Sequence, residues 1–187
     1  MRNTRGFYLD TAARHRWQAI APSARVQVTM EKPRLRWSGI GYLDTNSGDE
    51  PLESGFARWD WARASTPDSG TVLYNVTPRQ GPPYRTAIQF TADSQEPQCT
   101  EAPAPQGLPG TLWRVKRSTP ADAATEVRLL ETLEDTPFYA RSLVRATVDG
   151  NPLKLFHESL DLDRFRSRWV QMLLPFRMPR RRSRERD

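Results

Sequence analysis

The sequence contains little cysteine and histidine, and this scarcity excludes several classes of functional site. Cys99 is the only cysteine among 187 residues, so the chain has no disulfide framework, which favours a reducing compartment. Two histidines and one cysteine are too few for a zinc site built from those ligands. The motifs of phosphate-binding loops, dinucleotide-binding folds, zinc proteases and serine hydrolases are also missing. The chemistry left open is that of carboxylate, histidine and aromatic side chains.

Long apolar runs are missing as well. No window approaches the roughly 18 apolar residues of a membrane-spanning helix, and residues 1–10 lack the apolar core of a signal peptide. We therefore expect a cytoplasmic protein, in peripheral contact with the inner face of the membrane. The net charge of +6 is concentrated in residues 177–187, which hold six arginines and two acidic residues. This terminal cluster would fit an anionic membrane surface or a nucleic acid.

The 16 prolines and ten glycines interrupt short apolar runs that alternate with a period of two, which predicts strands joined by turns. Asp149-Gly150 is typical of a two-residue hairpin turn. Residues 161–174 change to helical spacing and predict one amphipathic helix capped by Asp161. The strands that we predict cover residues 25–30, 35–44, 56–64, 71–78, 84–92, 111–118, 126–133, 139–148 and 152–160, with residues 93–110 as the longest irregular segment. The fold class is therefore all-β with a helical C-terminal end.

Two pairs of side chains are of types that can take part in catalysis. The period of two places Tyr42 and Asp44 on one face of the strand 35–44, and it would put His15 and Trp17 on one face if residues 14–22 were also a strand. Each pair also has an ordinary structural explanation, a strand end entering a turn and a surface histidine beside a core tryptophan. The spacing alone does not decide between these explanations and a functional site.

Four stretches together resemble the bacterial carotenoid 1,2-hydratases, also called hydroxyneurosporene synthases. They are "RHRWQAIAPSARVQV", "RWSGIGYLDTNSGDEPLESGFARWDWARA", "LEDTPFYARS" and "ESLDLDRFRSRWVQMLLPFRMPR". The resemblance implies lipocalin-like antiparallel β-barrels, of which this chain holds the C-terminal portion. On this basis, residues 1–30 are the remnant of a preceding half that contributes pocket residues. Residues 31–176 form a lipocalin-like barrel domain that includes the helix 161–174, and residues 177–187 form a disordered basic tail.

The resemblance implies a hydro-lyase that adds water across the terminal 1,2 double bond of an acyclic carotene, of the neurosporene or lycopene type, without metal or redox cofactor. The family's His-x-Trp and Tyr-x-Asp positions match His15 with Trp17 and Tyr42 with Asp44. We expect Asp44 to act as the acid, His15 as the base, and the two aromatic rings to stabilise a carbocation. The residues expected to contact the substrate are Trp37, Gly41, Asn46, Trp59 and Trp61.

An acid of this kind must be held protonated. A carboxylic acid of ordinary pKa near 3.9 stays neutral near pH 7 only if its site destabilises the carboxylate by about 4 kcal/mol. A barrel mouth lined by tryptophan and tyrosine could provide such an environment.

Two other functional classes stay open from the sequence. One is a lipocalin-like protein that binds isoprenoids without reacting, or a truncated inactive homologue. The other is an RNA-binding module, which would use the arginine tail but gives no reason for the residues of the pocket. For the hydratase we expect an acyclic carotene as substrate, contact of the C-terminal helix and arginine tail with an anionic membrane, and self-association through surface left uncovered by the missing half. We expect no nucleic-acid partner.

Overall fold

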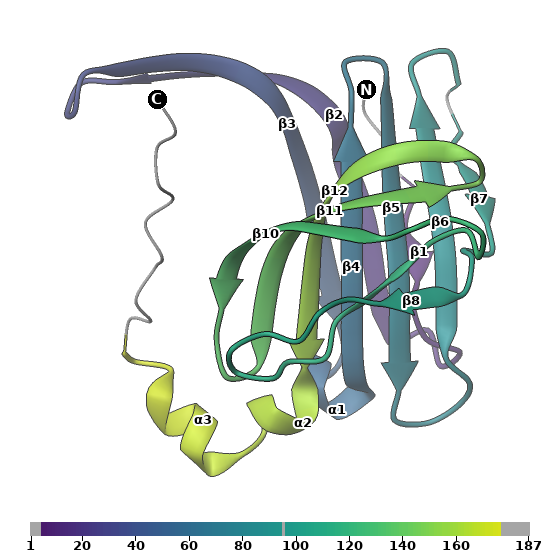
Figure 1. Ribbon diagram of the computed structural model, residues 1–187, viewed down its shortest axis with the longest axis vertical. Helices are drawn as coiled ribbons and strands as arrows, with labels where there is room; N and C mark the ends of the chain where they lie inside the picture. The colour runs from purple at the N-terminus through teal and green to yellow at the C-terminus, as the bar shows by residue number, and fades with distance from the viewer. Residues whose placement is uncertain (1–4, 95, 177–187) are drawn as a thin grey trace.

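The computed structural model describes residues 5–94 and 96–176, which are built mostly of antiparallel strands (Figure 1). The largest sheet has seven strands in the order β10-β11-β12-β4-β5-β6-β7. Its strands are β4 (Phe56–Ser65), β5 (Ser69–Pro78), β6 (Tyr84–Thr91), β7 (Gln98–Thr100), β10 (Arg128–Asp135), β11 (Tyr139–Val148) and β12 (Asn151–Asp161). The predicted all-β class, with antiparallel strands and helices at the C-terminal end, is confirmed.

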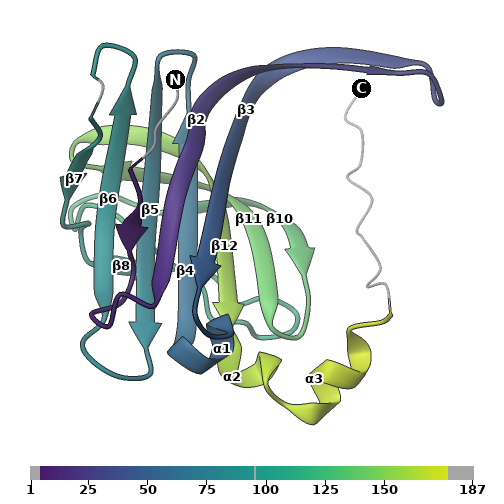
Figure 2. The same ribbon diagram turned by 180° about the vertical axis from the view of Figure 1, so that it is seen from behind.

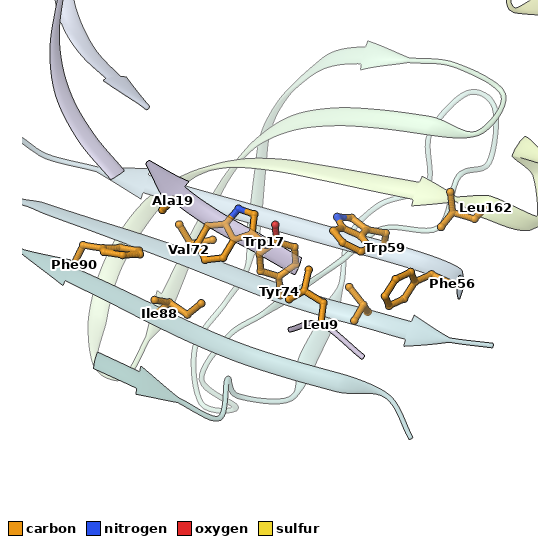
Figure 3. Close-up of a cluster of buried hydrophobic side chains, with 11 residues drawn as sticks. Leu9, Trp17, Ala19, Phe56, Trp59, Val72, Tyr74, Ile88, Phe90 and Leu162 are labelled. Carbon is orange, nitrogen blue, oxygen red and sulfur yellow. The ribbon is translucent and has the colours of Figure 1, made fainter. Parts of the chain in front are cut away.

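A three-stranded sheet covers one face of the large sheet. Its strands are β1 (Phe7–Tyr8), β2 (His15–Met30) and β3 (Leu35–Gly48). The core between the two sheets is rich in aromatic rings, with Trp17 and Tyr74 among its fully buried members (Figure 3). Burying each large apolar side chain contributes on the order of 1.5–3 kcal/mol, so this layer fixes β2 and β3 against the large sheet.

The opposite face of the large sheet is covered by the segment between β7 and β10, which includes the small sheet of β8 (Pro105–Gly107) and β9 (Ser118–Pro120). Asp60 is 1% exposed here and accepts hydrogen bonds from Ser118 Oγ at 3.0 Å and from Ser159 Oγ. Trp59 and Trp61, its neighbours along β4, pack on the other face with the aromatic core. The period of two along residues 56–64 therefore places the two tryptophans and Asp60 on opposite faces of the sheet.

The hairpin of β2 and β3 extends beyond the body of the protein and bends away from it (Figures 1 and 2). We call residues 25–40 the arm. Its large apolar side chains include Leu35 and Trp37, the second of which is 48% exposed. The boundary predicted after residue 30 falls at the tip of the arm, and β2 and β3 pair on both sides of it. The division into residues 1–30 and 31–176 stays a prediction, and the predicted basic tail lies outside the described residues.

Two predicted elements are wrong. The single helix expected over residues 161–174 is two short helices, α2 (Leu162–Phe165) and α3 (Arg168–Leu173), because Ser167 adopts an extended conformation between them. The N-cap is confirmed, since the Asp161 side chain accepts the backbone N–H of Arg164 at 3.0 Å. Of residues 111–118, only Ser118 belongs to a strand, β9, and residues 111–117 form a loop in which Arg114 has a φ of 57°.

Other local predictions hold. Asp149 and Gly150 have φ values of 51° and 75°, as a tight hairpin turn between β11 and β12 requires. A short helix α1 (Leu52–Gly55) connects β3 to β4. Among the described residues, none of the helices has the length and apolar character needed to span a bilayer.

Candidate active site

Asp44 lies on β3 opposite Ala19 of β2, and its carboxylate accepts two hydrogen bonds on one oxygen. Trp17 Nε1 donates to Asp44 Oδ2 at 2.7 Å, and the Tyr42 hydroxyl donates to the same atom at 2.9 Å. Oδ1 makes no hydrogen bond with any residue in the described part of the chain. Asp44 is half-buried, and one of its carboxylate oxygens is anchored while the other has no partner among the described residues.

The arrangement follows from strand geometry. Tyr42 and Asp44 are two residues apart on β3 and project from the same face. Trp17 pairs with Asn46, two pairs along from Asp44, so its indole reaches the carboxylate diagonally across the hairpin. Trp17 is fully buried, with its ring 5.3 Å from that of Tyr74. The core thus holds the indole N–H in place, and through it the carboxylate.

Tyr42 is a neutral donor in this site. Burial is the main cause that raises the pKa of Tyr42 well above its ordinary value, and the negative charge and hydrogen bond of Asp44 raise it further. Its ring packs against Trp61, with 5.6 Å between the ring centroids. The phenol therefore keeps its proton over the range of pH in which proteins fold.

Arg63 is a member of this site that the sequence did not reveal. Its guanidinium lies 4.9 Å from the ring centroid of Tyr42 and 4.8 Å from that of Phe156. Burial lowers the pKa of Arg63, while Tyr42, Asp44 and Glu158 act in the opposite direction. The signal was available in part, because the period of two places Arg63 on the same face of β4 as Trp61.

His15 belongs to a second polar pair at another level of the hairpin. Asp10 Oδ2 accepts the His15 backbone N–H at 2.8 Å and lies 3.0 Å from His15 Nδ1. His15 pairs with Gly48, four residues along β3 from Asp44, which corresponds to about 13 Å between the two levels. His15 is 5% exposed, and its Nε2 is buried without a partner among the described residues. Asp10 was missed from the sequence, and the structure does not bring His15 to Asp44.

The residues expected to contact the substrate are dispersed. Trp61 lies beside Tyr42, whereas Trp59 is 6% exposed within the core and Trp37 lies on the arm. Asn46 is exposed opposite Trp17. A side chain at Gly41 would collide with Val26, because an added Cβ would lie 2.2 Å from Val26 Cγ2. The space beside Gly41 is therefore filled by the Val26 side chain of the neighbouring strand.

Within the described ranges, no three histidine, cysteine, aspartate or glutamate side chains cluster in a way that could hold a metal ion. The site thus consists of one carboxylate with two neutral donors, aromatic faces and one guanidinium. Such a set can transfer a proton and can stabilise a positive charge that develops beside the rings.

The chain is similar to known proteins along almost its whole length. The family model described as carotenoid hydratase CrtC matches residues 3–187. Three proteins named acyclic carotenoid 1,2-hydratase are 53% identical over 95% of this chain (Thiocapsa roseopersicina), 44% identical over 92% (Rubrivivax gelatinosus) and 36% identical over 89% (Cereibacter sphaeroides). The chain spans 44%, 43% and 59% of their lengths, respectively. The chain belongs to the CrtC family of carotenoid hydratases.

Proposed function

We propose that this chain carries the acid centre of a hydro-lyase that adds water across the terminal 1,2 double bond of an acyclic carotene, of the neurosporene or lycopene type. The product is a tertiary alcohol. The observation that supports this most directly is the Asp44 carboxyl group, which has two donors on Oδ2 and a free Oδ1. The names of the relatives supply the substrate class.

The hydrogen bonds suit a carboxylic acid that donates from Oδ1. When Asp44 is protonated on Oδ1, Oδ2 is the carbonyl oxygen and can accept both the Trp17 N–H and the Tyr42 O–H. After the proton has left, the same two donors stabilise the carboxylate that forms. The two donors therefore hold the carboxyl group by one oxygen and leave the reacting oxygen without a partner among the described residues.

The reaction begins when Asp44 Oδ1 gives its proton to the less substituted carbon of the double bond. The π electrons form the new C–H bond and leave a tertiary carbocation on the neighbouring carbon. A cation close to the face of Trp or Tyr gains on the order of 1–2 kcal/mol in a desolvated site, and Tyr42 and Trp61 offer such faces. A lone pair of water then forms the C–O bond.

The proton released by that water returns to the Asp44 carboxylate, so one carboxyl group completes the cycle. This version fits the separation of about 13 Å between the levels of Asp44 and His15 along the strands. A role for His15 as the base stays a prediction, and it would need water molecules to connect the two levels.

The test is the reaction carried out in D2O. Purified protein is incubated with lycopene or neurosporene in liposomes, and the pigments are analysed by mass spectrometry. We expect a product heavier by one water, with one deuterium fixed on carbon beside the new alcohol. Product without fixed deuterium would contradict protonation of the double bond, and absence of product would contradict hydration by this chain.

A non-catalytic isoprenoid-binding protein is the alternative. This alternative predicts quenching of tryptophan emission by the carotene without any product.

A further proposal concerns membrane contact, through a C-terminal surface that exposes apolar side chains. The indole rings of Trp113 and Trp169 stack on this surface with their centroids 6.4 Å apart. Its exposed apolar side chains are Leu112, Trp113, Trp169, Met172, Leu174 and Phe176. The sequence continues with six arginines within residues 177–187, and each basic residue near an anionic leaflet contributes roughly 1 kcal/mol.

Co-sedimentation with liposomes tests this contact. We expect the double variant Met172→Asp, Phe176→Asp to lose binding to anionic vesicles, while Trp37→Ser on the arm keeps it. Equal binding by all three proteins would contradict a membrane-binding role for the C-terminal surface. Analytical ultracentrifugation of the same preparations measures the predicted self-association.

A further inference from the structure

Arg63 lies between two aromatic rings beside the proposed acid. It pairs with Phe156 across β4 and β12, and Tyr42 of β3 covers it from the other sheet. The guanidinium is 4.9 Å from the Tyr42 ring centroid and 4.8 Å from the Phe156 ring centroid. We call the space between these two rings the slot. Because Tyr42 also donates to Asp44, the slot adjoins the carboxyl group.

The Arg63 guanidinium packs against the two rings, and the charges of Asp44 and Glu158 act on it without direct contact. In the described part of the chain it makes no hydrogen bond and no ion pair, although it is half-buried. Other arginines are anchored differently: Arg117 donates to Ser142 at 2.9 Å, and Arg141 pairs with Glu158 at 2.9 Å. Arg63 can therefore leave the slot without breaking a hydrogen bond with another described residue.

The slot has the character of a cation site. The face of each ring carries the negative part of its quadrupole, so two facing rings attract a positive charge placed between them. Protonation of an alkene next to Asp44 would create a second cation close to the same rings. Two cations cannot occupy the slot together, because they repel each other in a partly desolvated space.

We propose that the slot between Tyr42 and Phe156 holds the carbocation of the reaction, and that Arg63 fills it until an apolar chain displaces the guanidinium. This inference rests on the proposed hydration at Asp44. The ligand that fits is an apolar chain whose end is branched and becomes positively charged. Arg63 is then a specificity-determining residue, since it leaves only for a chain that gains enough by covering the rings.

A stable cation can probe the slot without any turnover. Octyltrimethylammonium carries a branched positive end that resembles the tertiary carbocation, and octyl tert-butyl ether is a neutral molecule of similar shape. Their affinities are measured by titration calorimetry for the wild type and for Arg63→Met, which keeps an unbranched side chain without the charge. We expect Arg63→Met to bind the ammonium at least tenfold more tightly and the ether less than threefold more tightly.

Three further variants serve as controls. Arg63→Lys keeps a cation and should bind both probes like the wild type, while Arg145→Met removes an exposed arginine from β11 and should change neither affinity. Adding Phe156→Leu to Arg63→Met removes one ring, and the gain for the ammonium should fall at least fivefold. Phe156 is 42% exposed, so this substitution leaves the core intact.

The outcomes separate the slot from the hydratase proposal. Equal gains for both probes in Arg63→Met, or no gain for the ammonium, would overturn the cation site, and so would a gain that survives the loss of Phe156. The binding preference does not depend on product formation. If the preference is found while no carotene is hydrated, the slot stands as a cation site and the proposed reaction fails.

Discussion

Trp17 on β2 donates its indole N–H to Oδ2 of Asp44 on β3 at 2.7 Å, and this bond joins the aromatic core to the carboxylate. Because Trp17 is fully buried, the position of Oδ2 is set by the packing between the two sheets. The Tyr42 hydroxyl reaches the same oxygen from two residues away on β3. The site therefore has one donor fixed by tertiary packing and one fixed by strand geometry.

Removing the donor of Tyr42 should slow hydration without unfolding the protein. A hydrogen bond to a charged group contributes about 1.5–3 kcal/mol, so Tyr42→Phe should lower kcat by roughly 10- to 100-fold if the bond forms fully as the carboxylate develops. Tyr8→Phe changes a tyrosine that is 55% exposed and should leave kcat unchanged. Wild-type turnover in Tyr42→Phe would show that this hydrogen bond does not support the acid.

The two histidines should carry their protons on opposite ring nitrogens. His15 Nδ1 faces the Asp10 carboxylate at 3.0 Å, whereas His157 Nε2 faces the Ser118 carbonyl oxygen at 2.8 Å, and both partners can only accept. Long-range proton–nitrogen NMR spectra at mildly alkaline pH should therefore show one Nδ1–H and one Nε2–H tautomer.

The substitution Asp10→Asn tests the first assignment. Burial alone would raise the pKa of Asp10, but hydrogen bonds from the Arg14 and His15 backbones and from the His15 ring outweigh it and hold this pKa below its ordinary value. Asp10 is thus an acceptor at mildly alkaline pH. We expect Asp10→Asn to change the His15 signals and to leave those of His157 in place. The same signals in both proteins would mean that Asp10 does not fix the tautomer.

Acid should destabilise the protein through His157. Burial lowers the pKa of His157 and outweighs the opposing effect of Asp60, so the folded protein keeps this ring neutral. Below about pH 6.5 the unfolded chain binds a proton that the folded chain does not, and the free energy of unfolding should fall by up to about 1.4 kcal/mol per pH unit.

Denaturant unfolding at several pH values between neutrality and pH 5 measures this slope. His157→Gln keeps a side-chain donor for the Ser118 carbonyl but cannot titrate, so its slope should be smaller than that of the wild type. An identical slope in the two proteins would assign the acid sensitivity to other groups.

Gly55 should tolerate no side chain, because it packs on the ring of His15. A Cβ added there would lie 2.3 Å from His15 Cε1, and His15 is buried. Gly55→Ala should lower the free energy of unfolding by about 1–3 kcal/mol. Gly110→Ala is the matched control, since a Cβ at Gly110 meets nothing within 4 Å. Equal stability of the two variants would contradict the close packing.

The sequence predicts those features that depend on local geometry. The period of two places Tyr42 with Asp44 and separates Trp61 from Asp60, because alternation along a strand does not depend on the rest of the fold. The Asp149-Gly150 turn follows from backbone preferences within two residues. These predictions succeed because each depends only on residues that are close together in the sequence.

Features that depend on contacts between distant segments could not be predicted in this way. Arg63 and Phe156 lie side by side only because β12 pairs with β4, and the pairing of these distant strands cannot be predicted from local sequence patterns. The spacing of apolar residues in 161–174 is helical throughout, yet Ser167 is extended and divides the helix. The register between β2 and β3 places His15 and Asp44 at different levels of one hairpin, and the sequence alone does not give this register.

The assignment of Asp44 as the acid is tested most directly by comparing the rates of hydration by Asp44→Asn and Asp49→Asn. Asp49 carries an exposed carboxylate just beyond the end of β3. Both variants are first shown to be folded and to bind the carotene by tryptophan quenching. We expect Asp49→Asn to form the water adduct at the wild-type rate and Asp44→Asn to form none above background. Turnover by folded Asp44→Asn at the wild-type rate would contradict the assignment of Asp44 as the acid.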